Sequence, residues 1–278
     1  MHPRHRIDLT EPAHLGDRDG YSPPVHRYAP APGLADLVRR YWMPVWSLPE
    51  GRATVQRVLQ YPVCQLVVAP SYALLVGPAR GLSTRELTGS GWALGAMLQP
   101  AAGALLLDGP VSAVTDGAVP LDDLAHVDGP ALAERVRDAI GDTPADPVRQ
   151  QAAVLVLEEA LAALPPPDEQ GLLVNAVVEH VENESTVERV SQVCEKFALS
   201  ERSLQRLTAR RVGLSPKWLI QRRRLHEAAE RLRAPGVAGR PDLASVATAL
   251  GYADQAHFGR DFKSVTGLTP GEFAAEPR

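Results

Sequence analysis

LGYADQAHFGRDFK, residues 250–263, is the stretch that decides how the C-terminal part of this chain folds. A helix of small residues ends at Gly251, which can adopt the left-handed conformation that closes a helix. A second helix restarts after Asp254, whose side chain is placed to cap its N-terminus. Phe258 and Phe262 lie four residues apart and predict a buried stripe, whereas the opposite face is polar or basic. The stretch therefore predicts two helices joined by a turn.

A shorter, degenerate copy of this pattern lies upstream, at residues 197–207. Ser200 takes the capping position, and Leu204 and Leu207 form the buried side of the helix that follows. A helix with a good N-terminus begins at Ser215 and continues through the Arg run at 222–224, which we expect to lie near phosphates. Two such units joined by a basic helix predict a protein that binds DNA.

The chemistry of the outer faces suits base recognition. A helix fits the major groove, where Arg recognises guanine and Gln recognises adenine through paired hydrogen bonds. Two helices held one duplex turn apart, about 34 Å, can read successive grooves on one face of DNA. The alternative is a pair of ordinary amphipathic helices with solvated charges. Two units in register around a basic linker favour DNA binding.

Charge is distributed unevenly along the chain. The net charge is -4, but residues 200–263 carry 13 basic and 6 acidic side chains. Residues 1–170 carry 13 basic and 20 acidic side chains. A basic segment on an acidic protein indicates a localised site for a polyanion.

The rest of the chain predicts a β-rich front half followed by helices. Short apolar runs at 63–69, 73–76, 84–88 and 92–98 suit a small antiparallel sheet or barrel, and a short helix should follow Pro100. Further helices are expected at 130–140, 147–163, 171–183, 187–197, 201–211, 216–233, 243–250, 255–265 and 271–275. The fold class is thus α+β. We expect a loose tail at 1–25, a sensing domain at 26–128, a helical connector at 129–167, and a DNA-binding domain at 168–278, with a flexible connector at 234–241 inside it.

The C-terminal residues resemble the DNA-binding domain of the AraC/XylS family of bacterial transcription regulators. The resemblance rests on Gly251-Tyr252, Asp254, Phe258, Arg260 and Phe262-Lys263, then Gly267-Leu268-Thr269-Pro270, with Ser215-Pro216 and Arg224-Leu225 in the linker helix. It implies seven helices, two of which insert into adjacent major grooves. It places base contacts on Arg202, Gln205, Arg206, Gln255, Ala256, His257 and Arg260, and backbone contacts or positioning on Ser200, Lys217, Arg224 and Lys263.

The first unit departs from the family pattern at two positions. Ala198 stands in the turn where the family usually has Gly, and a left-handed alanine should cost on the order of 1 kcal/mol. Glu201 opens the first reading helix, where it favours the helix dipole but repels nearby phosphate. We therefore expect the second unit to hold its groove contacts more firmly than the first.

The family usually pairs this domain with a sensing or dimerising domain, often a cupin-like barrel. Runs at 57–62, 99–102 and 119–124 resemble front domains of actinobacterial members. A small-molecule effector would bind an aromatic pocket drawn from Tyr41, Trp42, Trp46, Tyr61, Tyr72 and Trp92, although aromatics are also ordinary core residues. The alternative is a front domain that binds a protein partner and no ligand. Double-stranded DNA is the expected partner, with RNA polymerase if the protein activates and a homodimer as a further option.

The sequence offers no basis for catalysis. His26 and His126 are isolated, so no cupin-type metal cluster is expected, and no nucleophile elbow or phosphate loop occurs. Gly89-Ser90-Gly91 is interpreted as a turn. Two cysteines cannot build the four-cysteine zinc site of DNA-repair methyltransferases that share this type of domain, and both thiols are expected to be buried. We expect no catalytic residues, no metal and no cofactor.

The chain also lacks the sequence signals of a membrane or secreted protein. No apolar run of roughly 18 residues suggests a membrane span. Residues 1–6 are not followed by the apolar segment of a signal peptide. We therefore expect a cytoplasmic protein.

Overall fold

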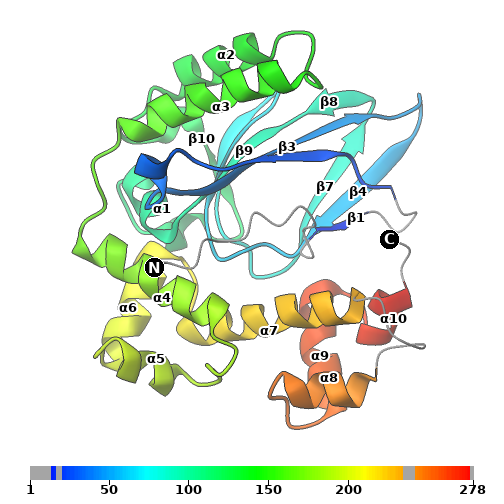
Figure 1. Cartoon of the computed structure of the whole chain (residues 1–278), viewed down its shortest axis with the longest axis vertical. Coiled ribbons are helices and arrows are strands. Elements are labelled where there is room, and N and C mark those ends of the chain that lie inside the picture. Colours follow the sequence, from blue (N-terminus) through cyan, green and yellow to red (C-terminus); the bar gives the residue numbers. More distant parts are fainter. Residues whose placement is uncertain (1–13, 17–20, 234–241, 276–278) are drawn as a thin grey trace.

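The structure, a computed structural model, describes residues 14–16, 21–233 and 242–275. A β-rich N-terminal half and an all-helical C-terminal half lie against each other (Figure 1). The fold class expected from the sequence is therefore confirmed.

The larger of two sheets has seven strands. Its strands are β2 (Val25–Tyr28), β3 (Val38–Ser47), β5 (Gln65–Val68), β6 (Ala73–Val76), β8 (Ser90–Trp92), β9 (Leu94–Leu98) and β10 (Ala118–Pro120). They are arranged in the order β10-β6-β5-β9-β3-β2, with β8 also paired to β3. Every pairing is antiparallel. The sequence predicted β5, β6 and β9 but missed β3, the longest strand.

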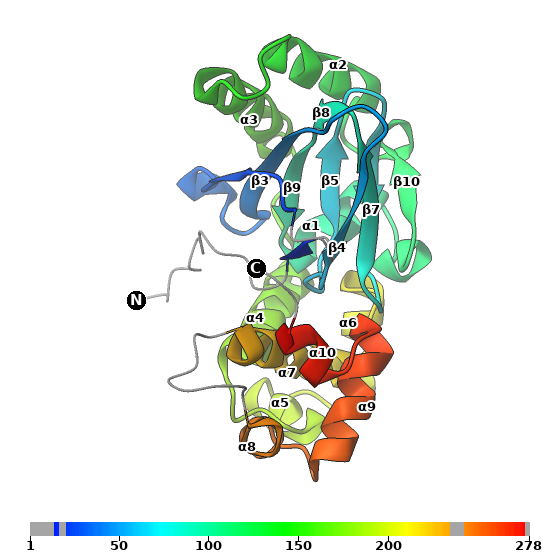
Figure 2. The same ribbon diagram turned by 90° about the vertical axis from the view of Figure 1, so that its right-hand side faces the viewer.

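The smaller sheet pairs β4 (Ala53–Val58) with β7 (Ser83–Thr88) and with β1 (His14–Gly16). Within the expected loose tail, residues 14–16 therefore form a strand paired to β4. Of the predicted turn at Gly89-Ser90-Gly91, only Gly89, with a φ of +52°, lies between β7 and β8, whereas Ser90 and Gly91 belong to β8. The two sheets face each other (Figure 2).

Helices cover the outer face of the larger sheet. They are α1 (Pro100–Leu107), α2 (Gly129–Ile140) and α3 (Pro147–Ala162), with 3-10 turns at Pro32–Leu34, Val111–Val114 and Leu121–Asp123. Asp128 and Asp146 cap α2 and α3 by accepting backbone N–H bonds, and each helix has a proline in its first turn. Buried residues of α2 and α3, such as Val136 and Leu157, share one core with β5 and β9. The segment predicted as a connector thus packs on the front sheet.

The C-terminal half has seven helices within the described residues. They are α4 (Glu169–Asn183), α5 (Val190–Lys196), α6 (Glu201–Arg211), α7 (Pro216–Arg233), α8 (Leu243–Ala249), α9 (Gln255–Thr266) and α10 (Pro270–Ala275). These match the predicted ranges to within a few residues. One core joins α4, α5, α6 and the start of α7; a second joins the rest of α7 to α8, α9 and α10. The predicted connector at 234–241 lies outside the described residues.

Several polar contacts fix the two halves together. The Arg39 guanidinium donates to both Glu182 carboxylate oxygens at 2.9 Å, and both side chains are largely buried. Asn175 on α4 accepts from the Ala101 N–H at 2.9 Å, and Thr115 donates to the Gly213 carbonyl at 2.9 Å. Bonds of this kind are geometrically demanding, so the orientation of α4 and α6 is tied to the front sheet.

Candidate functional site

The second helix-turn-helix unit is closed by the local devices that its sequence predicts. Gly251 has a φ of +72°, and the Asp254 carboxylate accepts the His257 N–H at 2.6 Å, so both the turn and the cap are confirmed. Phe258 and Phe262 are fully buried, with ring centroids 5.7 Å apart. Phe262 also contacts the Phe273 ring of α10 edge-on at 5.2 Å. Aromatic packing therefore fixes α9 from behind.

The outer face of α9 is open to solvent. The predicted base-contacting residues Gln255, Ala256, His257 and Arg260 are all exposed, and so is Lys263. All five side chains are therefore accessible to solvent, while Phe258 and Phe262 are buried behind the helix.

The first unit follows the same plan with a strained turn. Ser200 caps α6 by accepting the Ser203 N–H at 3.1 Å, and Leu204 is fully buried. Ala198 has a φ of +51°, the left-handed conformation that disfavours a side chain. The strain expected at this alanine is therefore present, at a cost on the order of 1 kcal/mol.

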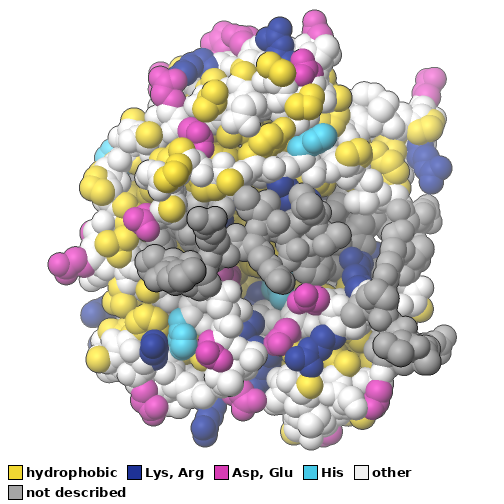
Figure 3. All heavy atoms as spheres, in the orientation of Figure 1, with side chains coloured by type: hydrophobic (Ala, Val, Ile, Leu, Met, Phe, Trp, Pro, Cys, Tyr) yellow, Lys and Arg dark blue, Asp and Glu magenta, His cyan; other side chains and the backbone are white. Residues whose placement is uncertain are grey.

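The outer face of α6 is exposed, but one of its predicted base-contacting side chains is hydrogen-bonded within the helix. Arg202, Gln205 and Arg206 are all exposed. The Gln205 amide donates to the Glu201 carboxylate at 3.2 Å, so one predicted reading residue is held by the acidic residue beside it. Figure 2 shows α6 and α9 along the same side of the C-terminal half. Figure 3 shows the opposite face of the molecule, where basic and acidic side chains are interspersed over the lower, helical half.

The Arg run of the linker helix corrects one expectation. Arg222 and Arg223 are 2% and 7% exposed, so they do not lie on an outer face near phosphates. Arg222 donates to the carbonyls of Ala79, Arg80 and Gly81 in the front half. Arg223 donates to the Val187 carbonyl and pairs with Glu227 at 2.8 Å. The helical period places these two residues toward the protein and away from solvent.

The remaining linker residues are placed differently. Lys217 is exposed. Arg224 is half-buried, with its guanidinium carbon 5.4 Å from the Tyr252 ring centroid. Arg224 therefore joins α7 to the second unit. Burial lowers the pKa of Arg222 to about 9, which leaves it protonated at neutral pH.

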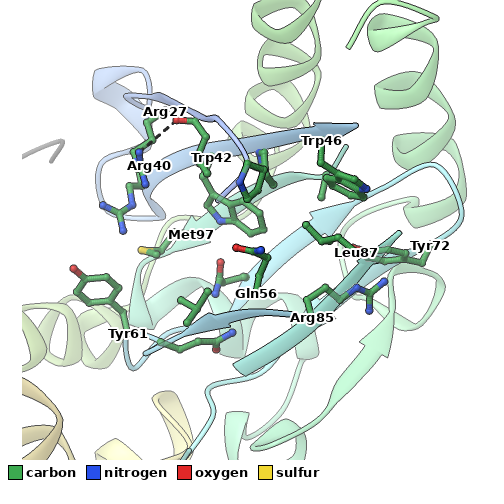
Figure 4. A pocket seen from close by; sticks show the side chains of 17 residues that line it. Arg27, Arg40, Trp42, Trp46, Gln56, Tyr61, Tyr72, Arg85, Leu87 and Met97 are labelled. Atoms are coloured by element: carbon green, nitrogen blue, oxygen red, sulfur yellow. Dashed lines mark hydrogen bonds between the residues drawn. The ribbon is translucent and has the colours of Figure 1, made fainter. Parts of the chain in front are cut away.

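A cavity of about 180 Å³ lies between the two sheets. A single water needs only about 10–15 Å³ by this measure, so the cavity has room for a small organic molecule. Four of the predicted pocket aromatics line it: Trp42, Trp46, Tyr61 and Tyr72. The other lining residues are Pro23, Val25, Arg27, Arg40, Pro44, Gln56, Val58, Gln60, Gln65, Arg85, Leu87, Ala93 and Met97. Figure 4 shows Arg40 and Tyr61 at one end and Arg85 and Tyr72 at the other.

Tyr41 and Trp92 were wrongly assigned to this pocket. Tyr41 is fully buried and Trp92 is 6% exposed, and both belong to the core beneath α1, α2 and α3. Successive side chains of a strand point to opposite faces, so Tyr41 points away from the cavity that Trp42 lines. Trp92 pairs with Val45 across β3 and β8 and shares that core face.

Sequence reasoning also missed several polar lining residues. Arg40, Trp42, Pro44 and Trp46 alternate along β3 and all line the cavity. This period of two was the available signal, and it was overlooked because β3 was not recognised as a strand. Arg85 on β7 gave no comparable signal, because only the facing of the two sheets brings it to the cavity.

One wall of the cavity contacts the linker helix directly. The Tyr61 ring stacks on His226 of α7, with centroids 4.5 Å apart, and the Arg40 guanidinium lies 5.4 Å from the same tyrosine ring. A His226 ring nitrogen lies 3.4 Å from the Gln60 carbonyl oxygen. Burial and nearby Arg222 lower the pKa of His226 to about 3, so the imidazole is neutral.

Other reactive groups are sparse within the described part of the chain. No three His, Cys, Asp or Glu side chains there come together as metal ligands. Cys64 is buried, and burial raises its pKa to about 12. Cys194 is only half-buried, which corrects the expectation of two buried thiols. Among these residues, no helix combines the length and apolar character needed to cross a bilayer.

Comparison with known proteins gives two domain matches and a set of distantly similar structures. Residues 193–276 match a helix-turn-helix domain family, and residues 26–120 match a domain family of unknown function, DUF6597. No curated protein matches the chain. Among solved structures, an apo variant of ToxT from Vibrio cholerae is 11% identical, with a TM-score of 0.41 over 86% of this chain and 98% of that one. ToxT with a bound unsaturated fatty acid is 10% identical, with a TM-score of 0.39 over 100% and 98%.

The C-terminal helices thus include a helix-turn-helix domain, at residues 193–276.

Proposed function

We propose that the protein regulates transcription by placing α6 and α9 in adjacent major grooves on one face of double-stranded DNA. The observation that carries this proposal is that both helices present an exposed polar face and bury an apolar one, Leu204 in α6 and Phe258 and Phe262 in α9. Helix α7 joins the two units. Paired reading helices recognise successive grooves when their spacing matches one turn of the duplex.

The exposed side chains divide into two roles. Base contacts come from Arg202, Gln205 and Arg206 on α6, and from Gln255, Ala256, His257 and Arg260 on α9. Ser200, Lys217, Arg224 and Lys263 position the protein against the DNA backbone. Ser200 and Lys263 extend from the reading helices, whereas half-buried Arg224 acts by holding α7 against the second unit.

The front half supplies control in this proposal. Its cavity binds a small effector, and the contact of Tyr61 with His226 carries the occupancy of the cavity to α7. An activator of this kind would contact RNA polymerase, and the front half can also hold two copies together as a homodimer. No cofactor takes part.

A second candidate function is supported by one surface feature. Val148 and Leu155 on α3 are 74% and 55% exposed and lie two helical turns apart on the same face. Exposed apolar side chains at this spacing suit a protein contact. In this alternative the front half binds a protein partner, and the cavity has no regulatory role. Metabolite screening by thermal shift distinguishes the two, because only an effector raises the melting temperature of the isolated protein.

The replacement Arg260→Ala tests the DNA-binding proposal. Loss of one arginine that recognises a guanine should weaken binding by about 1–3 kcal/mol, which is roughly 5-fold to 150-fold in affinity. Gel-shift titration on fragments recovered by genome-wide footprinting measures this change. Arg135→Ala is the matched control, because it removes the same charge from exposed α2 in the front half. Equal affinities for wild type and Arg260→Ala would contradict the assignment of α9.

Salt dependence gives an independent check. Exposed cations that displace condensed counterions make the logarithm of affinity fall linearly with the logarithm of salt concentration. If Arg260 reads a base, Arg260→Ala should weaken binding to all sequences and also reduce discrimination at one base pair. A residue that holds only phosphate would reduce the salt slope by about one and leave the sequence preference unchanged.

A further inference from the structure

We propose that the cavity between the two sheets binds a small planar aromatic carboxylate, with its ring against Trp42 and Trp46 and its charge toward Arg40. This inference rests on the proposed function, because it names the chemical class of the effector. It comes from the shape and the charge of the residues that line the cavity.

The cavity has a flat aromatic wall because two glycines lie beneath it. Trp42 pairs across the sheet with Gly95, and Trp46 pairs with Gly91. A Cβ at position 95 would lie 2.2 Å from Cε2 of Trp42, and one at position 91 would lie 2.5 Å from Cζ2 of Trp46. Both indoles therefore lie down on the backbone of the neighbouring strand. A flat wall of this kind favours a planar ligand, since aromatic rings stack in offset or edge-on arrangements.

The charged groups at the cavity are positive. Arg27, Arg40 and Arg85 line it, whereas no acidic side chain does among the residues described by the structure. Arg40 is 8% exposed, so its guanidinium has lost most of its hydration. A guanidinium in such a place binds a carboxylate through charge-assisted, often bidentate hydrogen bonds. The lining therefore favours an anion.

The same aromatics also suggest an opposite hypothesis, a cage for an organic cation. Two of the four rings already have a cation over them. The Arg85 guanidinium lies 4.4 Å from the Tyr72 ring centroid, and that of Arg40 lies 5.4 Å from Tyr61. An ammonium ligand would be repelled by both arginines at short range. The cage hypothesis is thus disfavoured.

A buried donor gives further support for an acceptor on the ligand. The Trp42 indole N–H is buried and has no hydrogen-bond partner in the described part of the chain. Trp46, by contrast, donates its N–H to the Thr88 carbonyl at 3.2 Å. Leaving a buried donor unpaired is unfavourable, and a carboxylate or hydroxyl oxygen of a ligand would relieve it. Both Arg40 and Trp42 can then donate to the same molecule.

Binding is tested by isothermal titration of the full-length protein without DNA. The probes are benzoate, cinnamate and 2-naphthoate, each with its primary amide, together with cinnamylammonium and the flexible acid decanoate. We expect at least one aromatic carboxylate to bind, with its amide about tenfold weaker or more, because the amide lacks the charge that Arg40 recognises. The proposal is overturned if no aromatic carboxylate binds, if an amide or the ammonium binds as tightly, or if decanoate binds more tightly.

Two variants locate the ligand. Arg40→Gln should weaken binding of the aromatic carboxylate at least about tenfold and leave the amide nearly unchanged. Gly95→Ala should abolish binding of both, because the new methyl group displaces the Trp42 indole into the cavity. If Arg40→Gln fails to fold, Arg85→Gln at the opposite end replaces it, with a smaller expected loss. Retained affinity in both the arginine variant and Gly95→Ala would place the ligand elsewhere.

The controls separate this inference from the proposed function. Gly33→Ala adds a methyl group into open space, and Arg135→Gln removes a cation far from the cavity, so both should bind the carboxylate normally. Gel-shift titration without ligand tests DNA binding on its own. A protein that shifts DNA but binds no aromatic carboxylate disproves only the inference. A protein that binds the carboxylate but no DNA disproves the proposed function and leaves the ligand assignment standing.

Discussion

The two helix-turn-helix units share one plan but differ in how their turns are made and in what surrounds them. The second unit turns at Gly251, with a φ of +72°, whereas the first turns at Ala198, with a φ of +51°. The outer face of α9 is free of an acidic residue in its first turn, whereas Glu201 in α6 holds Gln205. The local sequence of the second unit thus suits both folding and reading better than that of the first.

The surroundings compensate for this difference. The first unit is fixed to the front half at Gly213, whose carbonyl accepts from Thr115, and to the start of α4, because Arg211 at the end of α6 pairs with Asp168. The second unit is stabilised by its own rings, by α7 and α10, and by a core that also includes Leu59 of the front half, but no hydrogen bond of the kind made by Thr115 is described between it and the front half. A motif with a weaker local sequence can therefore be held in place by tertiary contacts, and a strong local sequence needs fewer of them.

The largest effects are expected when a core side chain of either unit is truncated. Phe262→Ala removes a fully buried ring and should cost about 3–5 kcal/mol of the free energy of unfolding. Leu204→Ala, the counterpart in the first unit, should cost about 2–5 kcal/mol. Hydrogen exchange should show loss of protection confined to α8–α10 for Phe262→Ala and to α4–α6 for Leu204→Ala. Equal loss in both regions for either variant would mean that the units do not fold as separate cores.

The pH dependence of stability tests how the front half holds the helix between the units. The folded pKa of His226 is about 3, below the unfolded value of about 6.5, so the stability that depends on its neutral form is complete above pH 6.5. This contribution to the free energy of unfolding decreases as the pH falls from 6.5 toward 3, by at most about 1.4 kcal/mol per pH unit, because only the unfolded chain binds the proton. Urea unfolding at pH 7 and pH 5 measures this. His226→Gln should lose less stability over that interval than wild type, and an identical loss would contradict the assignment.

Substitutions at the two turn residues test whether the backbone of the first turn is more strained than that of the second. Gly251→Ala should cost about 1 kcal/mol or more, because the left-handed φ is strained and the new Cβ would lie 2.4 Å from Glu188 Oε1. Ala198→Gly should instead stabilise the protein by up to about 1 kcal/mol, since relief of strain is partly offset by unfolded-chain entropy. Chemical denaturation measures both changes. Opposite signs are expected, and stabilisation by Gly251→Ala would contradict the strain argument.

The smallest effect is expected at the start of the first reading helix. Glu201→Gln removes a negative charge close to the expected phosphates and weakens the hold on Gln205. Affinity for DNA should rise a few-fold, in line with the about 0.3–1 kcal/mol that a charge contributes at a helix end. Gel-shift titration of Glu201→Gln against the exposed front-half variant Glu134→Gln provides the measurement and its control. Weaker binding by Glu201→Gln would show that the carboxylate helps to position α6.

Much of the C-terminal half could be predicted because its signals are local. Apolar residues at helical spacing, the caps at Ser200 and Asp254, and Gly251 at the turn are all encoded within one helix length. The resemblance to the AraC type added the expected groove contacts, whose residues the structure places on exposed faces. The burial of Arg222 and Arg223 was not predicted. A run of arginines suggests an exposed surface, and only the packing of α7 against the rest of the protein shows which side of the helix is buried.

The front half was predicted less well because its cavity depends on contacts between distant strands. Tyr41, Trp42 and Trp46 look equivalent as aromatics, and only the alternation along β3 separates the core residue from the two that line the cavity. The sequence does not show that Gly91 and Gly95 will lie opposite Trp46 and Trp42. Register across a sheet is a non-local property, and it determined this site.

Trp218 gives the domain junction an optical label of its own. The Arg222 guanidinium that holds the front half lies 4.3 Å from the Trp218 ring centroid, and the indole is half-buried. The chain has four tryptophans, and two of the others, Trp42 and Trp46, line the cavity. A movement that separates the two halves would remove the cation and hydrate the indole, which shifts its emission to longer wavelength. With Trp42 and Trp46 replaced by phenylalanine, only Trp218 and the core residue Trp92 would emit, and the change in Trp218 emission against the buried Trp92 would report the coupling between the halves in real time, without any attached dye.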